Sequence, residues 1–138
     1  MIITGIDYSL RGPAICVHKG ELNEPFRFCA CKFYFLTDTK KYAQTFLSNI
    51  HGVLKYKLFQ ANIPVEIISP SEVKKKATGK GNADKKAMHM AFMQETGYNL
   101  KTLITPDKKE VTNPVSDIVD SYFVCKALFG KLKEALEN

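Results

Sequence analysis

The spacing of apolar residues changes near residue 40 of this chain, and that change limits the folds it can adopt. Before residue 37 the apolar residues fall into three short stretches rich in β-favouring side chains, at 2–7, 13–18 and 26–36. From Lys40 onward they recur at helical spacing as far as Ala61. The first part therefore predicts a three-stranded antiparallel meander, and the second part predicts a long crossover helix.

The elements expected after that helix complete an α/β fold. Residues 63–69 are predicted to form a fourth strand, and a strand that follows a crossover helix is expected to run parallel to the first. A loop rich in lysine and glycine, a helix at about 83–96, a polar loop at 97–112 and a final helix follow. This order predicts one ribonuclease H-like domain over residues 1–138, with a mixed sheet flanked by helices.

Bulk composition is that of an ordinary water-soluble domain. The chain has 138 residues, of which 45% are hydrophobic and 25% charged, which suits one globular domain. It contains no apolar run approaching the ~20 residues of a membrane span, and its N-terminus lacks a secretory pattern. We therefore expect a cytoplasmic protein, in the cytoplasm of the host cell if a bacteriophage encodes it.

Three aspartates stand where an apolar interior should begin. Asp7 ends a compact apolar strand, and Asp117 and Asp120 share one face of the final helix because they are three residues apart. That face continues through Val124 and Leu128, a stripe expected to be buried. Buried carboxylates need a cation or hydrogen bonds, and Mg²⁺ prefers hard oxygen ligands. The alternative is that Asp7 caps a turn and Asp117 caps the helix.

The net charge of +6 is concentrated in one segment of the chain. Residues 72–86 contain six lysines against two acidic residues. The lysines are Lys74, Lys75, Lys76, Lys80, Lys85 and Lys86. Because the segment also contains Gly79 and Gly81, it is predicted to be a mobile loop that follows a phosphate backbone. The alternative is a solvated surface without a partner.

Cysteine and histidine give no metal-binding pattern. The four cysteines include no Cys-x-x-Cys pair, so reduced, buried thiols are predicted in preference to a zinc site at Cys29 and Cys31. The three histidines are scattered and have no ligand spacing, so they are not expected to be ligands.

Three of these segments together resemble one family. Residues 3–7 resemble the first-strand catalytic motif of the RuvC-like Holliday junction resolvases, and residues 73–85 are similar to the DNA-contacting loop of that family. Asn113-Pro114 followed by Asp117 and Asp120 resembles its closing acidic helix. The motifs occur in the order of the family, so the resemblance covers most of the chain, and it is strongest to the bacteriophage-type branch.

The chain departs from the family pattern in its middle. Family members have a further strand between the long helix and the basic loop, and that strand carries a catalytic glutamate. Here residues 51–54 resemble the start of the helix that follows this strand, yet they directly continue the earlier helix. Glu66 lies near the start of its predicted strand and Glu72 belongs to the basic loop, so neither is assigned as the fourth carboxylate.

The resemblance implies a Mg²⁺-dependent endodeoxyribonuclease that cleaves four-way junctions and other branched DNA. Two Mg²⁺ ions, replaceable by Mn²⁺, would be held by Asp7, Asp117 and Asp120, and Lys85 would lie near the scissile phosphate. The implied DNA-binding residues are Lys74, Lys75, Lys76, Lys80 and Lys85. The resemblance also implies a homodimer, with no membrane contact and no small-molecule cofactor. The alternatives are a catalytically impaired module that binds branched DNA and a ribonuclease H-fold nuclease that acts on RNA.

Overall fold

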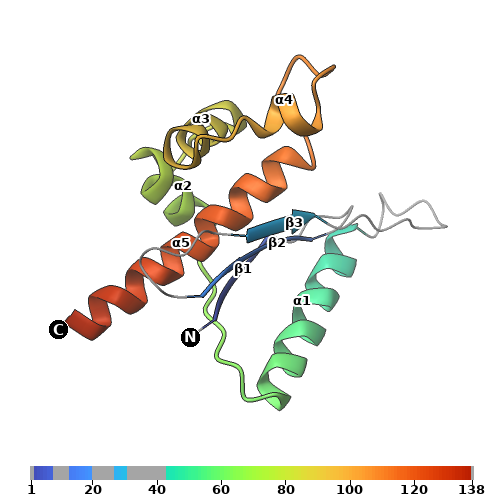
Figure 1. The fold of residues 1–138 in the computed structure, drawn as a ribbon. Helices are drawn as coiled ribbons and strands as arrows, with labels where there is room; N and C mark the ends of the chain where they lie inside the picture. The colour runs from blue at the N-terminus through green and yellow to red at the C-terminus, as the bar shows by residue number, and fades with distance from the viewer. Residues whose placement is uncertain (1, 8–12, 20–26, 31–42, 138) are drawn as a thin grey trace.

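The computed structural model describes residues 2–7, 13–19, 27–30 and 43–137, which form a small sheet and five helices (Figure 1). The strands are β1 (Ile3–Asp7), β2 (Ala14–His18) and β3 (Arg27–Ala30), and the helices are α1 (Ala43–Gln60), α2 (Pro70–Thr78), α3 (Lys85–Thr96), α4 (Leu100–Ile104) and α5 (Val115–Glu137). In the view of Figure 1, α2, α3 and α4 lie above the sheet and α1 lies below it. None of the described helices is long and apolar enough to cross a membrane.

The described strands form an antiparallel sheet in the order β1-β2-β3. β1 pairs with β2 from Ile3 opposite His18 to Asp7 opposite Ala14. β2 pairs in turn with β3. The predicted third strand extends to residue 36, and its part after residue 30 lies outside the described residues. Within the described ranges β1 is therefore an edge strand, and Asp7 lies at the end of this edge.

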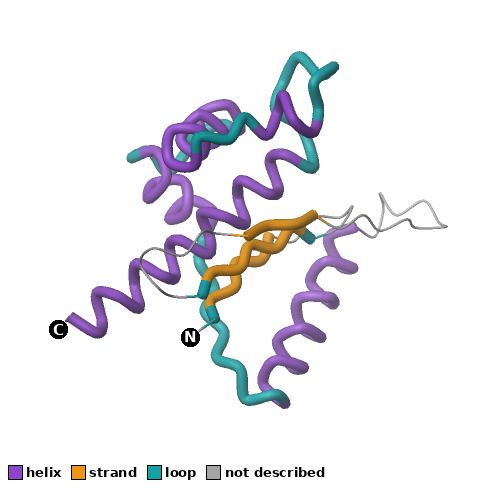
Figure 2. The backbone as a smooth tube through the Cα atoms, viewed as in Figure 1, coloured by secondary structure: helices purple, strands orange, loops and turns teal. Residues whose placement is uncertain are grey.

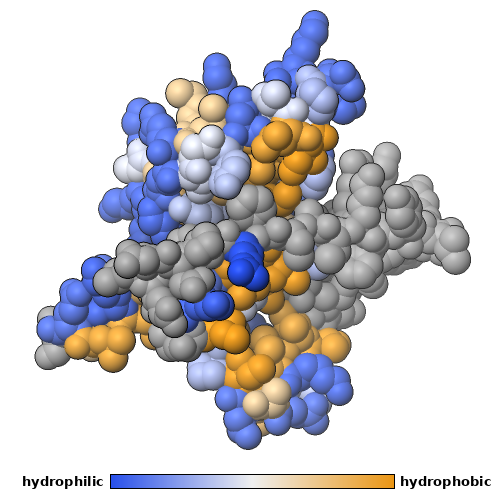
Figure 3. All heavy atoms as spheres, in the orientation of Figure 1, coloured by the Kyte–Doolittle hydropathy of each residue, from blue (hydrophilic) through white to orange (hydrophobic). Residues whose placement is uncertain are grey.

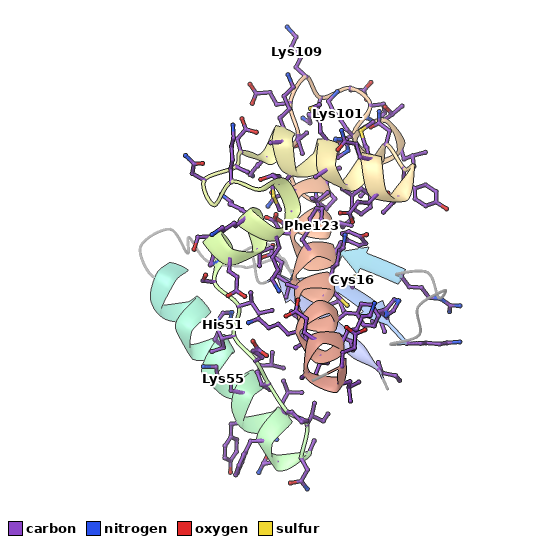
Figure 4. All side chains as sticks on the ribbon, turned by 90° about the vertical axis from the view of Figure 1, so that its left-hand side faces the viewer. Cys16, His51, Lys55, Lys101, Lys109 and Phe123 are labelled. Atoms are coloured by element: carbon purple, nitrogen blue, oxygen red, sulfur yellow. The ribbon has the colours of Figure 1, made fainter. Side chains whose placement is uncertain are left out.

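Helix α5 packs across the sheet and forms most of the core with it. The alternation of strand residues places Ile3, Ala14 and Cys16 on the buried face, toward α5. Gly5 is required at the closest approach, because a Cβ atom there would lie 2.3 Å from the Ser121 carbonyl oxygen. Figure 4 shows Cys16 beside α5, where this helix crosses the sheet. The absent side chain of Gly5 thus fixes how closely β1 lies under α5.

The predicted fourth strand is wrong. Residues 63–69 form a loop between α1 and α2 and belong to no strand (Figure 2). Pro64 has no amide hydrogen to donate to a neighbouring strand. Glu66 forms an ion pair with Lys131 of α5, which holds the segment along the helix and away from the sheet edge. The side chain of Ile67 is 69% exposed, as expected for a segment with no partner on that side.

The predicted basic loop is also wrong, because its residues form a helical hairpin. Ser69 caps the start of α2, Pro70 occupies its first turn, and Gly79 ends it in the left-handed conformation at φ 79°. Asp84 caps α3 by accepting a hydrogen bond from the Ala87 amide at 2.8 Å. In the sequence these cap residues lie among lysines and glycines, and the segment was therefore predicted to be a loop. Helix α4 similarly interrupts the predicted polar loop at 97–112.

Cys16, Cys125 and His89 lie in the interior of the protein. Cys16 and Cys125 are free and buried, as predicted, whereas the side chains of Cys29 and Cys31 lie outside the described residues. His89 is buried and its Nε2 accepts a hydrogen bond from the Lys101 amide at 3.3 Å, which ties α3 to the start of α4. His18 is buried as well.

Candidate active site

The contact between β1 and α5 brings the three predicted aspartates together. Gly5 packs against the backbone of α5 at Ser121, so Asp7, two residues further along β1, lies beside the preceding turn of the helix. That turn carries Asp117 and Asp120. Asp117 lies inside α5, which begins at Val115, so the reading of Asp117 as the helix cap is wrong. All three carboxylates are half-buried.

Burial and mutual repulsion make the ionised carboxylates costly. Burial is the largest cause that raises the pKa of Asp7 to about 7, and the neighbouring Asp120 and Asp117 raise it further. Burial followed by repulsion from Asp117 raises the pKa of Asp120 to about 6. A cation between these groups would relieve both effects, because it favours the charged form of each carboxylate.

Two lysines from the basic segment approach the same place. A small pocket of about 100 Å³ is lined by Lys74, Lys85, Met88, Ser116, Val119 and Asp120. The charge of Lys85 lowers the pKa of both Asp7 and Asp120, opposing their upward shift, and Lys74 does the same for Asp120. Helices α2, α3 and α5 thus meet at a pocket lined by the carboxylate of Asp120 and by two lysines.

Two polar residues of this region, Asn113 and Ser116, were given no role in the site by the sequence. The Asn113 Oδ1 atom accepts hydrogen bonds from the Ser116 hydroxyl at 2.6 Å and from Lys85 Nζ at 3.4 Å. The same hydroxyl lies 3.4 Å from Asp117 Oδ1. The three-residue spacing of Asn113 and Ser116 at a helix start is a signal of local capping, but only the fold brings Lys85 to them.

The remaining predicted DNA-binding lysines do not line the pocket. Lys75, Lys76 and Lys80 are exposed on α2 and in the turn that follows it. Figure 3 shows hydrophilic side chains over the part of the surface where α2 and α3 lie in Figure 1. The predicted set therefore divides into two lysines at the pocket and three on the surface next to it.

The donor atoms fit a divalent cation, but they do not form a closed cage. Across the ranges that the structure describes, no three histidine, cysteine, aspartate or glutamate side chains are grouped tightly enough to hold a metal ion as they stand. The carboxylate of Asp120 is nevertheless close enough to raise the pKa of Asp7, and carboxylate oxygen is what Mg²⁺ prefers.

Neither nearby glutamate supplies a fourth carboxylate. Glu66 pairs with Lys131, and Glu72 lies 3.0 Å from the same Lys131 Nζ. Lys131 is eleven residues after Asp120 on α5, which corresponds to roughly 16 Å along the helix axis. Both glutamates are therefore held at the other end of the helix, away from Asp7.

Comparison with known proteins gives one family and one fold. The model of the family "crossover junction endodeoxyribonuclease RuvC" matches residues 27–114, more than half of the chain. This span includes α1, α2, α3 and α4 but none of the three aspartates. A structure of Thermus thermophilus RuvC superposes with a TM-score of 0.59 at 16% sequence identity, covering 96% of this chain and 97% of the other. This likeness identifies a ribonuclease H-like α/β fold. No curated protein sequence matches the chain.

Proposed function

Because the chain belongs to the RuvC family of crossover junction endodeoxyribonucleases, we propose that it is a metal-dependent nuclease that cleaves four-way (Holliday) junctions and other branched DNA by phosphodiester hydrolysis. The observation that carries the proposal is the pocket at which Asp120, Lys74 and Lys85 meet beside Asp7. Carboxylates can hold divalent cations there, and the ammonium groups can attract the phosphate that is to be cut. We further propose that residues 1–138 form one nuclease domain and that the protein acts in the cytoplasm.

The proposed ligands of the metal are Asp7, Asp117 and Asp120. Two bound Mg²⁺ or Mn²⁺ ions would supply activation of the attacking water and stabilisation of the leaving 3′-oxygen. The raised pKa values of Asp7 and Asp120 mean that these groups lose protons when a cation binds. Lys85 is proposed to contact the scissile phosphate and to stabilise the charge that develops on it.

The helical hairpin of α2 and α3 is the proposed DNA-binding surface. Lys75, Lys76 and Lys80 extend the positive charge of the pocket across α2 and the turn after it. Ammonium groups contact phosphates without reading sequence, which suits an enzyme that selects its substrate by shape. We propose that Lys74 and these three lysines follow the backbone of one junction arm.

We also propose that the protein is a homodimer that associates through α1. This helix buries part of Leu54 and Leu58 on one side, yet it exposes Val53, Tyr56 and Phe59 on the other. Apolar side chains gather over the lower part of the surface in Figure 3, where α1 lies in Figure 1. A large exposed apolar patch favours a contact with another protein surface, and a two-fold dimer suits a symmetric junction.

The function is tested by separating cutting from binding. Asp7→Asn keeps the size of the side chain but removes a proposed metal ligand and a negative charge. We expect it to abolish Mg²⁺-dependent cleavage of a synthetic four-way junction in single-turnover assays, with junction affinity unchanged or slightly higher. The double variant Lys74→Ala/Lys75→Ala should instead weaken junction binding. The slope of log affinity against log salt concentration should become shallower by about one to two units.

Lys133→Ala provides a matched control for the loss of a lysine, since Lys133 pairs with Glu137 near the end of α5. This variant should bind and cut as the parent protein does. Wild-type protein that binds the junction but never cuts it would indicate a DNA-binding module in place of a nuclease. Faster cutting of RNA hairpins than of DNA junctions at the same salt concentration would assign RNA as the substrate.

A further inference from the structure

Lys85 is an exposed residue in the first turn of α3, and its long side chain needs a partner to stay at the pocket. A lysine side chain that becomes fixed loses much of its rotamer entropy, so it remains mobile unless an interaction holds it. Its Nζ lies 3.4 Å from Asn113 Oδ1, an atom 28 residues away in the sequence. This hydrogen bond joins the start of α3 to the segment just before α5.

Asn113 is in turn held by the buried Ser116. The Ser116 hydroxyl donates its single proton to Asn113 Oδ1 at 2.6 Å, a much closer contact than its 3.4 Å approach to Asp117. Ser116 lines the pocket from the first turn of α5. The acceptor that meets Lys85 is therefore anchored to the same helix that carries Asp117 and Asp120.

We propose that Asn113 is a positioning residue: it holds the Lys85 ammonium group at the pocket through a neutral acceptor, and Ser116 fixes the orientation of that acceptor. The neutrality of the amide has a chemical advantage. A lysine paired directly with Asp7 or Asp120 would occupy carboxylate oxygens that a cation needs. Bound to Asn113, Lys85 uses one of its three N–H donors and keeps two for the phosphate oxygen of a substrate. This last role rests on the proposed nuclease function.

A purely local role for Asn113 makes a different prediction. The Asn113–Ser116 hydrogen bond alone would stabilise the start of α5, and its loss would lower the free energy of unfolding without affecting Lys85. The mobility of Lys85 therefore distinguishes positioning from capping, and it is measured on the free protein without metal or DNA.

The first experiment follows the lysine ¹⁵Nζ and ¹³Cε NMR signals of the full chain. Asn113→Ala should make Lys85 Cε as mobile as a solvent-exposed lysine, while Asn113→Asp, which keeps an acceptor oxygen, should restore its order. Asn99→Ala is the matched control, because Asn99 only caps α4 by accepting from the Thr102 amide. Unchanged order of Lys85 in Asn113→Ala would overturn the proposal, whether or not the protein cuts DNA. If Asn113→Ala does not fold, Ser116→Ala makes the same test, and it too should increase Lys85 mobility.

The second experiment is a double-mutant cycle on single-turnover junction cleavage. Removal of a donor that stabilises a developing charge costs ~100-fold or more, so Lys85→Ala should fall in that range. Asn113→Ala should slow cleavage ~10-fold at unchanged junction affinity, and adding it to Lys85→Ala should cause no further loss. Independent, multiplying losses would show that Asn113 does not act through Lys85. A wild-type protein without cleavage would reject the nuclease function and leave the NMR result to decide the positioning role.

Discussion

At the scale of single residues, the site stores an electrostatic cost that a ligand can relieve. Asp7 and Asp120 are half-buried, repel one another and receive only partial compensation from Lys85. A protein selected for stability alone would replace one of them with a neutral residue. The retention of both is a property of binding sites, where perturbed pKa values concentrate.

This cost gives the metal-free protein a characteristic pH dependence. The folded state binds protons at Asp7 and Asp120 more tightly than the unfolded chain does, so the associated stability is present below about pH 4. It is lost as the pH rises through about 6 to 7. In EDTA we expect the free energy of unfolding to fall by several kcal/mol between pH 4 and pH 8 from these two groups, at ~1.4 kcal/mol per pKa unit.

Urea unfolding of Asp7→Asn measures this contribution. The variant should be more stable than the parent at pH 8 and should lose much of the pH dependence, because it removes the titrating group whose pKa is raised most. Asp107→Asn, at an exposed position in the loop before α5, is the control and should follow the parent curve. A curve for Asp7→Asn parallel to that of the parent would contradict the assigned cause.

At the scale of elements, the position of the site depends on how β1 lies under α5. A shift of the helix by one turn along the strand would place Ser121 and Val124 beside Asp7 in place of the two aspartates. The hydrogen bond from the Cys125 thiol to the Ile3 carbonyl at 3.5 Å and the missing Cβ of Gly5 both act at this crossing. The position of Asp7 therefore depends on the packing of Gly5, two residues earlier in β1, against α5.

Gly5→Ala should consequently be among the most damaging small substitutions in the chain. Its Cβ would lie 2.4 Å from the Cys125 amide nitrogen as well as against Ser121, and backbone atoms cannot move aside as a side chain would. We expect a loss of about 3 kcal/mol in urea unfolding, the upper end for overpacking. Gly52→Ala is the matched control: Gly52 is exposed in α1 with open space around it, so the change should stabilise by up to ~1 kcal/mol. Similar effects from Gly5→Ala and Gly52→Ala would show that the backbones of β1 and α5 are not in close contact at Gly5.

At the scale of the whole molecule, two regions of the surface differ in polarity. The hairpin of α2 and α3 presents lysines and the pocket, whereas α1 and the loop after it present apolar side chains. In the exposed apolar set, the solvent-accessible fraction runs from 48% at Val65 to 77% at Phe59. Such an arrangement leaves the proposed DNA-binding side free if two copies meet through α1.

The dimer is tested by sedimentation velocity at tens of micromolar protein. The parent chain should sediment at twice its mass of 15.5 kDa, and Phe59→Ser with Tyr56→Ser should sediment as a 15.5 kDa monomer. Leu136→Ser is the control, because Leu136 is 82% exposed at the far end of α5 and should have no effect on mass. A parent protein that is monomeric at these concentrations would reject the proposed dimer.

The sequence predicted these features unequally, for physical reasons. Helical spacing depends on local pattern, so α5 and the shared face of Asp117 and Asp120 followed from it, whereas the approach of Asp7 depends on the packing of β1 against α5. The assignment of residues 63–69 failed because a strand needs a partner, and apolar alternation does not show whether one is present. The contact of Lys85 with Asn113 joins residues far apart in the chain, and only the three-dimensional packing of α3 against α5 produces it.

The exposed stretch between α1 and α2 has a consequence for solubility in a crowded cell. Ile63, Val65 and Ile67 alternate as in segments that stack into fibrils, and unpaired segments of this kind are sites of aggregation. Pro64 and Glu66 occupy the positions between them: one interrupts the amide hydrogen-bond ladder that stacking requires, and the other places like charges next to each other in successive copies. The same five residues can thus pack against a single folded surface while they resist open-ended assembly.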